Sequence, residues 1–525
     1  MAFASEKIIR FSLIFLILFT PLAFGSVYVW AFSIMEIIVF SMLMILIVKK
    51  GLIQERKISF PLFSPIIVFL ALILFQMMPL PPSAIKLLSP KTYELYSQTL
   101  DGYPGEMSED GGRRQIIAGT GTIIIGGRLE AVDKALEGKK AKEYFKNWRS
   151  ISLYSHATRT GLLKIISYLG VFLLIINYVD TKRELVWVST AVVYSGIFVT
   201  LVGIIQKLGG ASRIYWFWEP FFKQDASFFG PFVNPNHFAG YMEMVIPVAI
   251  GLFIWQWRNL LRDQARGFRE FLIKIGSEDG CKLILFSFLI IVMVGALFLS
   301  SSRGGVISFL GSMIFLLLMV NKREKGKRNL FILVGLLISI FSFLIWMGIK
   351  PLLEEFGAIQ DVSRDYDIQY RFQNWKDTTK IVRDFPLFGV GLGTFAAIFP
   401  KYKSIDLQYH YLYLENDYLQ LLCEMGIVGF GVFFWFMLSF FREVRSRCSK
   451  YEAERTSSIH FICLYGSLTG IVAIMIHSFW DFNMHIPSNA LLLTMLISLA
   501  IAGLRITLES HSEYAGGKDS GTLIS

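Results

Sequence analysis

Charged residues are scarce in this chain of 525 residues. Only 17% of the residues are Asp, Glu, Lys or Arg, whereas 54% are hydrophobic. Soluble globular proteins carry about 25% charged residues, so this composition excludes an ordinary soluble fold. The mean hydropathy of +0.53 favours a protein whose surface faces lipid over much of its area.

Cysteine is also rare, with four residues in the chain: Cys281, Cys423, Cys448 and Cys463. None lies in the long loops predicted below to be external, so no disulfide framework is expected. No two cysteines have CxxC spacing, which argues against a zinc site. An acidic cluster suited to a metal ion is missing as well, and we expect no cofactor. No repeat with a period of 20–50 residues is present.

The hydrophobic residues are concentrated in blocks, and crossing a membrane takes roughly 20 such residues in a helix. The blocks are 8–24, 28–48, 62–80, 160–179, 185–207, 238–256, 283–301, 305–321, 329–349, 417–441, 459–479 and 486–505. This pattern predicts an all-α polytopic membrane protein with about twelve transmembrane helices. The first block follows Lys7 and Arg10 like a signal peptide, but a second block comes at once, so we expect an uncleaved span.

The basic residues behind the net charge of +11 are concentrated in particular loops of this topology. Basic residues follow every even-numbered block: Lys49 and Lys50, Lys182 and Arg183, Arg258 to Arg269, Lys322 to Arg328, and Arg442 to Lys450. Short loops rich in Lys and Arg stay cytoplasmic. Both termini are therefore predicted to be cytoplasmic, and nucleic-acid binding is not expected.

This sidedness divides the chain into alternating membrane and loop regions. Spans one to three occupy 1–80, spans four to nine occupy 159–349, spans ten to twelve occupy 417–505, and a cytoplasmic tail follows at 506–525. Two long external segments separate them. Segment 81–158 is predicted to be an insertion of mixed structure, with a strand at 122–127 and a helix at 128–147. Segment 350–416 is the large external loop.

The large external loop contains a predicted amphipathic helix at 371–384. Its residues Phe372, Trp375, Thr379 and Val382 fall on one helical face. A proline at position 386 ends the helix. Three glycines at alternate positions follow within 388–393, and glycines allow a sharp turn and close backbone approach. As a phosphate-binding motif this run is weak, because no strand–helix unit frames it.

Arg303 is the clearest candidate for a binding site. It lies in the run SSSRGG at the external end of two spans. Ionisable groups at membrane depth are costly and therefore informative, and the arginine fork suits phosphate oxygens. The alternative is an interfacial anchor that extends to lipid headgroups.

Three further polar groups lie at predicted external helix ends. Asn234, Asn236 and His237 open span six, and the asparagines are alternatively simple helix caps. His410, Glu415, Asn416 and Asp417 lead into span ten, as candidate bases or as caps that favour the helix dipole. His477, Asp481, Asn483 and His485 line the external turn between spans eleven and twelve.

Five segments together resemble the O-antigen ligase and polymerase family of bacterial polysaccharide enzymes over about residues 155–505. They are GPFVNPNHFAGYMEMVIP, SSSRGG, RFQNWKDTTKIVRDFPLFGVGLGTF, ENDYLQLLCEMGIVGF and HSFWDFNMHIPSNALLL. The resemblance implies a metal-independent glycosyltransferase of the bacterial inner membrane whose active face is periplasmic. Its implied donor is an undecaprenyl-pyrophosphate-linked glycan, and its acceptor is lipid A–core or a growing polysaccharide. Membrane lipids surround it.

The resemblance also implies roles for individual residues. Arg303 matches the arginine of the family's Ser-Arg-Gly motif, where arginines hold the donor pyrophosphate. The second arginine is not placed by a motif, and Arg371 and Arg213 are both candidates, with Arg371 in the better setting. The family's loop histidine precedes its Tyr-Leu-Gln run closely, but Glu415 stands there in this chain. Either His410 or Glu415 is then the base.

Ligase and polymerase cannot be separated from these residues. A rival interpretation is a polysaccharide or lipid-carrier transporter without bond-forming chemistry. Transporters commonly place polar groups near the bilayer midplane, whereas the motifs here gather at the predicted external face. A third interpretation is a membrane scaffold whose external loops bind partners.

Overall fold

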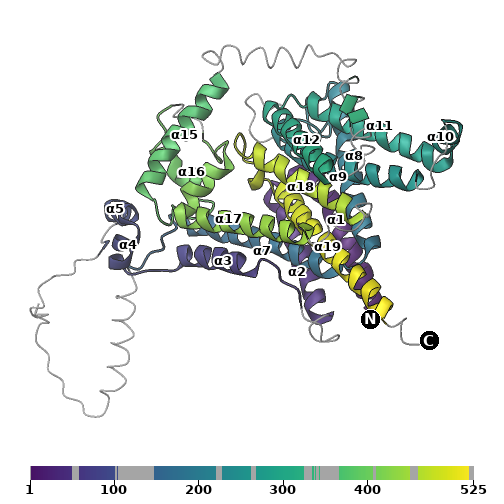
Figure 1. Cartoon of the computed structure of the whole chain (residues 1–525). Coiled ribbons are helices and arrows are strands. Elements are labelled where there is room, and N and C mark those ends of the chain that lie inside the picture. Colours follow the sequence, from purple (N-terminus) through teal and green to yellow (C-terminus); the bar gives the residue numbers. More distant parts are fainter. Residues whose placement is uncertain are drawn as a thin grey trace, which may run out of the picture.

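The computed structural model is built almost entirely of helices, as the hydrophobic blocks predict (Figure 1). It describes the chain apart from residues 1, 50–57, 101–102, 105–146, 220–227, 262–267, 406–409, 450–458 and 520–525, and apart from most of 324–365. The predicted strand at 122–127, helix at 128–147 and span at 329–349 lie wholly or mostly outside the described residues.

The helices of the first half begin with α1 (Ala2–Leu22), η1 (Phe24–Ser26), α2 (Val29–Ile47) and α3 (Phe63–Met77). Two short helices follow, α4 (Pro82–Leu88) and α5 (Pro90–Thr99). The long helices α7 (Ser155–Tyr178), α8 (Lys182–Leu208) and α9 (Pro235–Leu260) come next.

The second half begins with the short α10 (Phe268–Ile275) and the longer α11 (Glu278–Leu299) and α12 (Arg303–Arg323). The predicted external loop contains α15 (Tyr366–Asp384), α16 (Phe395–Ile398) and η4 (Phe399–Lys401). The chain then runs through α17 (Asp417–Ser449), α18 (Ile459–His477), η5 (Asn483–His485) and α19 (Pro487–Asp519).

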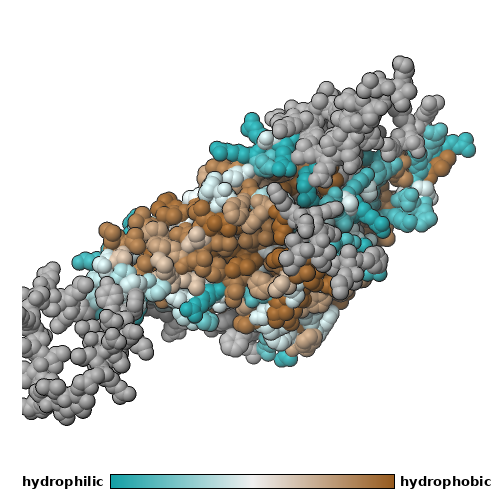
Figure 2. All heavy atoms as spheres, turned by 90° about the horizontal axis from the view of Figure 1, so that it is seen from below, coloured by the Kyte–Doolittle hydropathy of each residue, from teal (hydrophilic) through white to brown (hydrophobic). Residues whose placement is uncertain are grey.

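Eight of the described helices are long and apolar enough to cross a membrane, and α3 and part of α18 are shorter apolar helices. Large hydrophobic side chains such as Phe198, Leu285 and Phe434 are more than half exposed. Figure 2 shows hydrophobic residues across much of the visible face, with hydrophilic residues toward its ends. These features confirm the all-α polytopic membrane class, whereas the count of twelve spans stays a prediction.

Helix α9 forms the centre of the bundle. It contacts α8, α11, α12, α18 and α19, and every residue from His237 to Ile254 is buried. Two glycines of α18, Gly466 and Gly470, lie against the α9 backbone, where an added Cβ would come within 2.8 Å of carbonyl oxygens. Small residues at such interfaces let helix backbones approach closely in membranes.

Helix α15 is present, as predicted, and lies with α16 beside the first turns of α17 (Figure 1). The predicted apolar face is not the most buried one, because Phe372 is 55% exposed. The neighbouring face carries the buried Asn374, Asp377 and Thr378. Asp377 is buried at little cost because it accepts hydrogen bonds from the Ser404 amide and hydroxyl, both at 2.8 Å, and from Lys380 at 2.7 Å.

Candidate functional site

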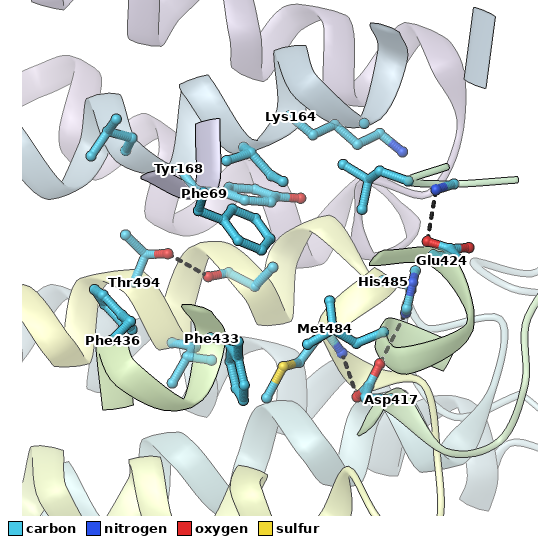
Figure 3. A pocket seen from close by; sticks show the side chains of 18 of the residues that line it. Phe69, Lys164, Tyr168, Asp417, Glu424, Phe433, Phe436, Met484, His485 and Thr494 are labelled. Carbon is cyan, nitrogen blue, oxygen red and sulfur yellow. Dashed lines mark hydrogen bonds and ion pairs between the residues drawn. The ribbon is translucent and has the colours of Figure 1, made fainter. Parts of the chain in front are cut away.

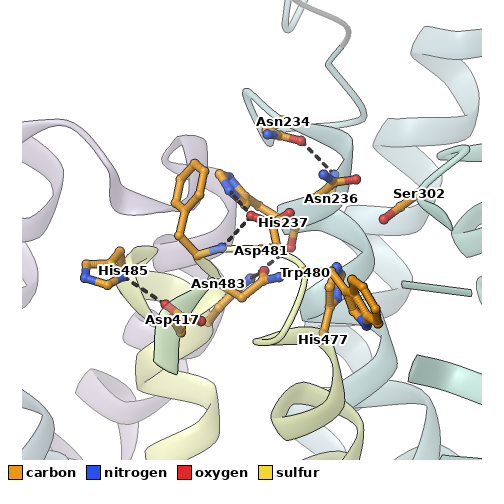
Figure 4. Close-up of polar contacts among 12 residues, drawn as sticks. Asn234, Asn236, His237, Ser302, Asp417, His477, Trp480, Asp481, Asn483 and His485 are labelled. Atoms are coloured by element: carbon orange, nitrogen blue, oxygen red, sulfur yellow. Dashed lines mark hydrogen bonds and ion pairs between the residues drawn. The ribbon is translucent and has the colours of Figure 1, made fainter. Parts of the chain in front are cut away.

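Polar residues from four helices meet at one end of the bundle (Figure 4). The starts of α9, α12 and α17 come together with the end of α18 and the turn 478–486 that follows it. These helix starts and this turn are where the sequence places its external polar groups. The structure thus brings segments that are far apart in the sequence into one cluster.

The two best arginine candidates both lie beside this turn. Nη1 of Arg371, from α15, donates a hydrogen bond of 2.5 Å to the Trp480 carbonyl. Arg303 is the first residue of α12. The next residue, Gly304, packs so closely that an added Cβ would lie 3.1 Å from Nε2 of His477 and 3.5 Å from Cβ of Trp480. The third candidate, Arg213, forms a 3.5 Å salt bridge with Glu219 on a loop beyond α8 and is half exposed.

His237 lies in the first turn of α9 beside the buried carboxylate of Asp481. Its Nε2 is 3.5 Å from Oδ1 of Asp481. Burial by itself raises the pKa of Asp481, but contact with His237 and the charges of His477 and Arg371 lower that pKa more strongly, to well below its usual range. The Asp481 carboxylate is therefore ionised at neutral pH.

A second buried pair joins α9 to α18. Nδ1 of His477 lies 3.1 Å from Oε1 of Glu243, and neither side chain is more than 1% exposed. A carboxylate and an imidazole at this depth need each other as partners, since an isolated buried charge is costly. Sequence reasoning missed Glu243 because it stands alone in an apolar block.

Asp417 links the turn 478–486 to the start of α17 through its side chain. Its carboxylate accepts hydrogen bonds from the Ser478 hydroxyl at 2.9 Å and the Met484 amide at 3.1 Å, and it lies 2.9 Å from Nδ1 of His485. Burial lowers the pKa of His485, but the hydrogen bond and charge of Asp417 and the charge of Glu424 raise it further, so that it lies above its usual value.

Two of the predicted polar residues cap helices. The Asn234 side chain accepts a hydrogen bond of 2.9 Å from the Asn236 amide at the start of α9. The Asn416 side chain accepts one of 2.9 Å from the Leu419 amide at the start of α17. Capping satisfies donors that a helix start would otherwise leave without partners. The capping alternative is thus confirmed for these two asparagines.

The two candidate bases of the external loop lie near the start of α17. His410 is exposed at the beginning of the non-helical segment 410–416 that leads into this helix. Glu415 is partly buried two residues before Asp417. Asp417 itself is hydrogen-bonded to the turn 478–486.

The glycine run wraps around a carboxylate of α17. Gly389, Gly391 and Gly393 all have left-handed φ values, of +65°, +108° and +74°, which non-glycine residues rarely adopt. Oε2 of Glu424 accepts a hydrogen bond of 2.7 Å from the Gly393 amide, and Oε1 accepts one of 3.2 Å from the Phe395 amide. These amides already have an acceptor, so the run has a structural role here.

A cavity of about 550 Å³ opens between α3, α7, α17 and α19. Most of its lining is apolar, with Phe433 and Phe436 at one end (Figure 3). The other end carries Lys164, Glu424 and His485. A cavity that is apolar over most of its length and charged at one end suits an amphiphile. Lys164 was not predicted, since it is a single charge inside a hydrophobic block.

Comparison with known proteins gives one family match. Residues 288–434 match the family described as O-antigen ligase. No curated protein matches the chain. The matched segment contains Arg303, Arg371, His410 and Glu415, and excludes His237 and Asp481. The O-antigen ligase resemblance is thereby confirmed for this segment, which contains three of the five sequence segments.

Proposed function

We propose, from the O-antigen ligase segment that this membrane protein carries at residues 288–434, that it is a glycosyltransferase acting on lipid-linked glycan. In this proposal the donor is a glycan on undecaprenyl pyrophosphate, and the acceptor is lipid A–core or a growing polysaccharide. The reaction takes place at the periplasmic face of the bacterial inner membrane and needs no metal ion.

The observation that carries the proposal is the convergence of two arginine-bearing elements on one turn. Arg371 donates a hydrogen bond to the carbonyl of Trp480. Arg303 precedes Gly304, where an added Cβ would lie 3.5 Å from Cβ of Trp480. Such a pair of arginines can bind a pyrophosphate leaving group, because each guanidinium group binds phosphate oxygens through paired hydrogen bonds.

The cavity supports a donor that arrives from the lipid. Its apolar walls come from four membrane helices, and its charged end, with Glu424 and His485, lies next to Asp417 of the polar cluster. An isoprenoid chain placed along α3, α7, α17 and α19 would point its headgroup toward that cluster. Burial of such a chain is favourable at roughly 25 cal/mol per Å² of apolar surface.

The chemistry then needs three functions. A hydroxyl oxygen of the acceptor attacks the anomeric carbon of the donor sugar, and the bond from that carbon to the pyrophosphate oxygen breaks. The arginines stabilise the charge that develops on the leaving group. A base takes the hydroxyl proton, and the sequence offers His410 or Glu415 for this role.

The test uses purified protein in nanodiscs with an undecaprenyl-pyrophosphate oligosaccharide, and it offers lipid A–core and a second lipid-linked glycan as separate acceptors. We expect Arg303→Ala and Arg371→Lys each to lower product formation by about 10²–10³-fold, the usual cost of losing a group that stabilises developing charge. Lys282→Ala serves as the control, because Lys282 is exposed at the opposite end of α11. Which acceptor is consumed distinguishes ligase from polymerase.

The transporter alternative makes the opposite prediction. A transporter would move fluorescent lipid-linked glycan between leaflets of a vesicle and form no new glycosidic bond. Lipid movement without product from the wild-type protein, or normal product from both arginine variants, would overturn the proposal.

A further inference from the structure

The pair His237–Asp481 has a geometry that the fold alone does not explain. Oδ1 of Asp481 accepts a hydrogen bond of 2.6 Å from the Phe482 amide and lies 3.5 Å from Nε2 of His237. The side chain of Asp481 is 1% exposed and that of His237 is 7% exposed. Within the described part of the chain, Oδ2 of Asp481 and Nε2 of His237 have no hydrogen-bond partner. Buried polar atoms without partners destabilise a fold by roughly 1–3 kcal/mol each, so they indicate a second role.

Both residues are held firmly in place. Nδ2 of Asn489 donates to the carbonyl of His237 at 2.9 Å and to Oδ1 of Asn483 at 2.8 Å, which ties the start of α9 to the turn. The Asp417 amide donates to the carbonyl of Asp481 at 3.2 Å. The pair is thus positioned by α9, α17 and α19 together, as a catalytic group must be.

His477 and His485 both face their carboxylates through Nδ1. His477 has Nδ1 on Glu243 and Nε2 against Gly304. His485 has Nδ1 on Asp417. His410 is exposed and has no buried carboxylate beside it in the described part of the chain. His237 instead faces the buried, ionised carboxylate of Asp481 through Nε2, and in the described part of the chain this nitrogen makes no hydrogen bond.

The pair also lies beside the proposed pyrophosphate site. Arg371 donates to Trp480, the residue directly before Asp481. Trp480 in turn borders Gly304 and the start of α12. Figure 4 places His237 and Asp481 between the His485–Asp417 pair and Ser302, which directly precedes the start of α12.

We infer that His237, oriented by Asp481, accepts the proton from the acceptor hydroxyl, and that the loop residues His410 and Glu415 do not. This inference rests on the proposed function. Asp481 fixes a proton on Nε2 of His237, which leaves the lone pair on Nδ1, because the bond made by one ring nitrogen sets the state of the other. The 3.5 Å separation shortens when substrate binds, as catalytic hydrogen bonds commonly do.

The step balances without any further reactant. The acceptor oxygen forms a bond to the anomeric carbon, and its proton moves to Nδ1 of His237. The bond between that carbon and the pyrophosphate oxygen breaks, and its electron pair leaves with undecaprenyl pyrophosphate. The imidazolium next to Asp481 then returns its proton to water.

The experiment measures transfer with the full-length protein in nanodiscs, over a range of pH. We expect His237→Gln to lower kcat by about 10²–10⁴-fold, the usual contribution of a positioned base, with the KM for the donor changed little. Asp481→Asn should also lower kcat, and it should move the acidic limb of the kcat/KM–pH profile. Added imidazole should partly restore His237→Ala. His156→Gln is the control, since His156 is exposed at the start of α7.

The outcomes separate this inference from the proposed function. Wild-type kcat and an unchanged pH profile in His237→Gln would overturn the inference, and so would a large loss confined to His410→Gln or Glu415→Gln. Normal activity in Arg303→Ala and Arg371→Lys would overturn the proposed function itself. If His237→Gln lowers Tm, imidazole rescue of His237→Ala decides: recovery supports the inference, and intact donor binding without recovery overturns it.

Discussion

The carboxylate of Glu424 accepts a hydrogen bond of 2.7 Å from the amide of Gly393, close to the break in α17 at Gly426. The same carboxylate accepts from the Phe395 amide at 3.2 Å and from Nε2 of Gln420 at 3.0 Å. Three donors from two segments therefore converge on one buried side chain. This contact fixes the glycine run against the helix that carries Asp417.

Removing the Glu424 carboxylate should destabilise the protein more than it changes the chemistry. Glu424→Ala leaves the buried amide of Phe395 without its acceptor, which costs about 1–3 kcal/mol, and also removes the partly buried bond from the Gly393 amide. We expect a clear fall in Tm measured by scanning fluorimetry in detergent. Glu94→Gln, at an exposed position on α5, is the control. An unchanged Tm in Glu424→Ala would show that the contact adds nothing to stability.

Gly426 should tolerate no side chain. It has φ +63° and ψ −173° inside α17, and an added Cβ would overlap the carbonyl of Leu387. Gly426→Ala should therefore lower the yield of monodisperse protein in size-exclusion chromatography. Gly431→Ala is a matched control on the same helix, because nothing lies within 4 Å of the added Cβ. Equal yields from the two variants would contradict the role of this break.

The sequence predicted the helices well, because a helix that crosses lipid must be apolar over most of its length. It predicted the glycine turn for a similar reason, since only glycine adopts those φ values readily. It failed on the buried face of α15, because Asp377 finds its partners at Ser404, in a turn that no local pattern marks. The His237–Asp481 pair was equally hidden, since it joins the start of α9 to the turn 478–486, far apart in the sequence.

Filling the cavity should impair use of the lipid-linked donor. Thr494 lines its apolar part (Figure 3), and Thr494→Phe would occupy space that we propose for the isoprenoid chain. We expect the KM for the undecaprenyl donor to rise several-fold, while a short-prenyl analogue is used as before. Leu310→Phe, on an exposed face of α12, is the control. Equal effects on both donors would show that the isoprenoid chain of the donor does not bind in this cavity.

The His485–Asp417 pair should make stability depend on pH. The pKa of His485 is raised in the folded protein, above an unfolded value of about 6.5. A raised folded pKa means that the imidazolium stabilises the fold fully below about pH 6.5 and loses this effect as the pH rises through the folded pKa. The charged groups that act on His485 are Asp417, Glu424 and Lys164.

His485→Gln should remove this dependence while keeping a donor near Asp417. We expect the Tm difference between wild type and His485→Gln to be largest at about pH 5.5 and to shrink toward pH 9. His156→Gln should follow the wild-type curve, because His156 is exposed and has no part in the cluster. A Tm difference of the same size at both pH values would mean that His485 stabilises the turn by packing and hydrogen bonding alone, without its charge.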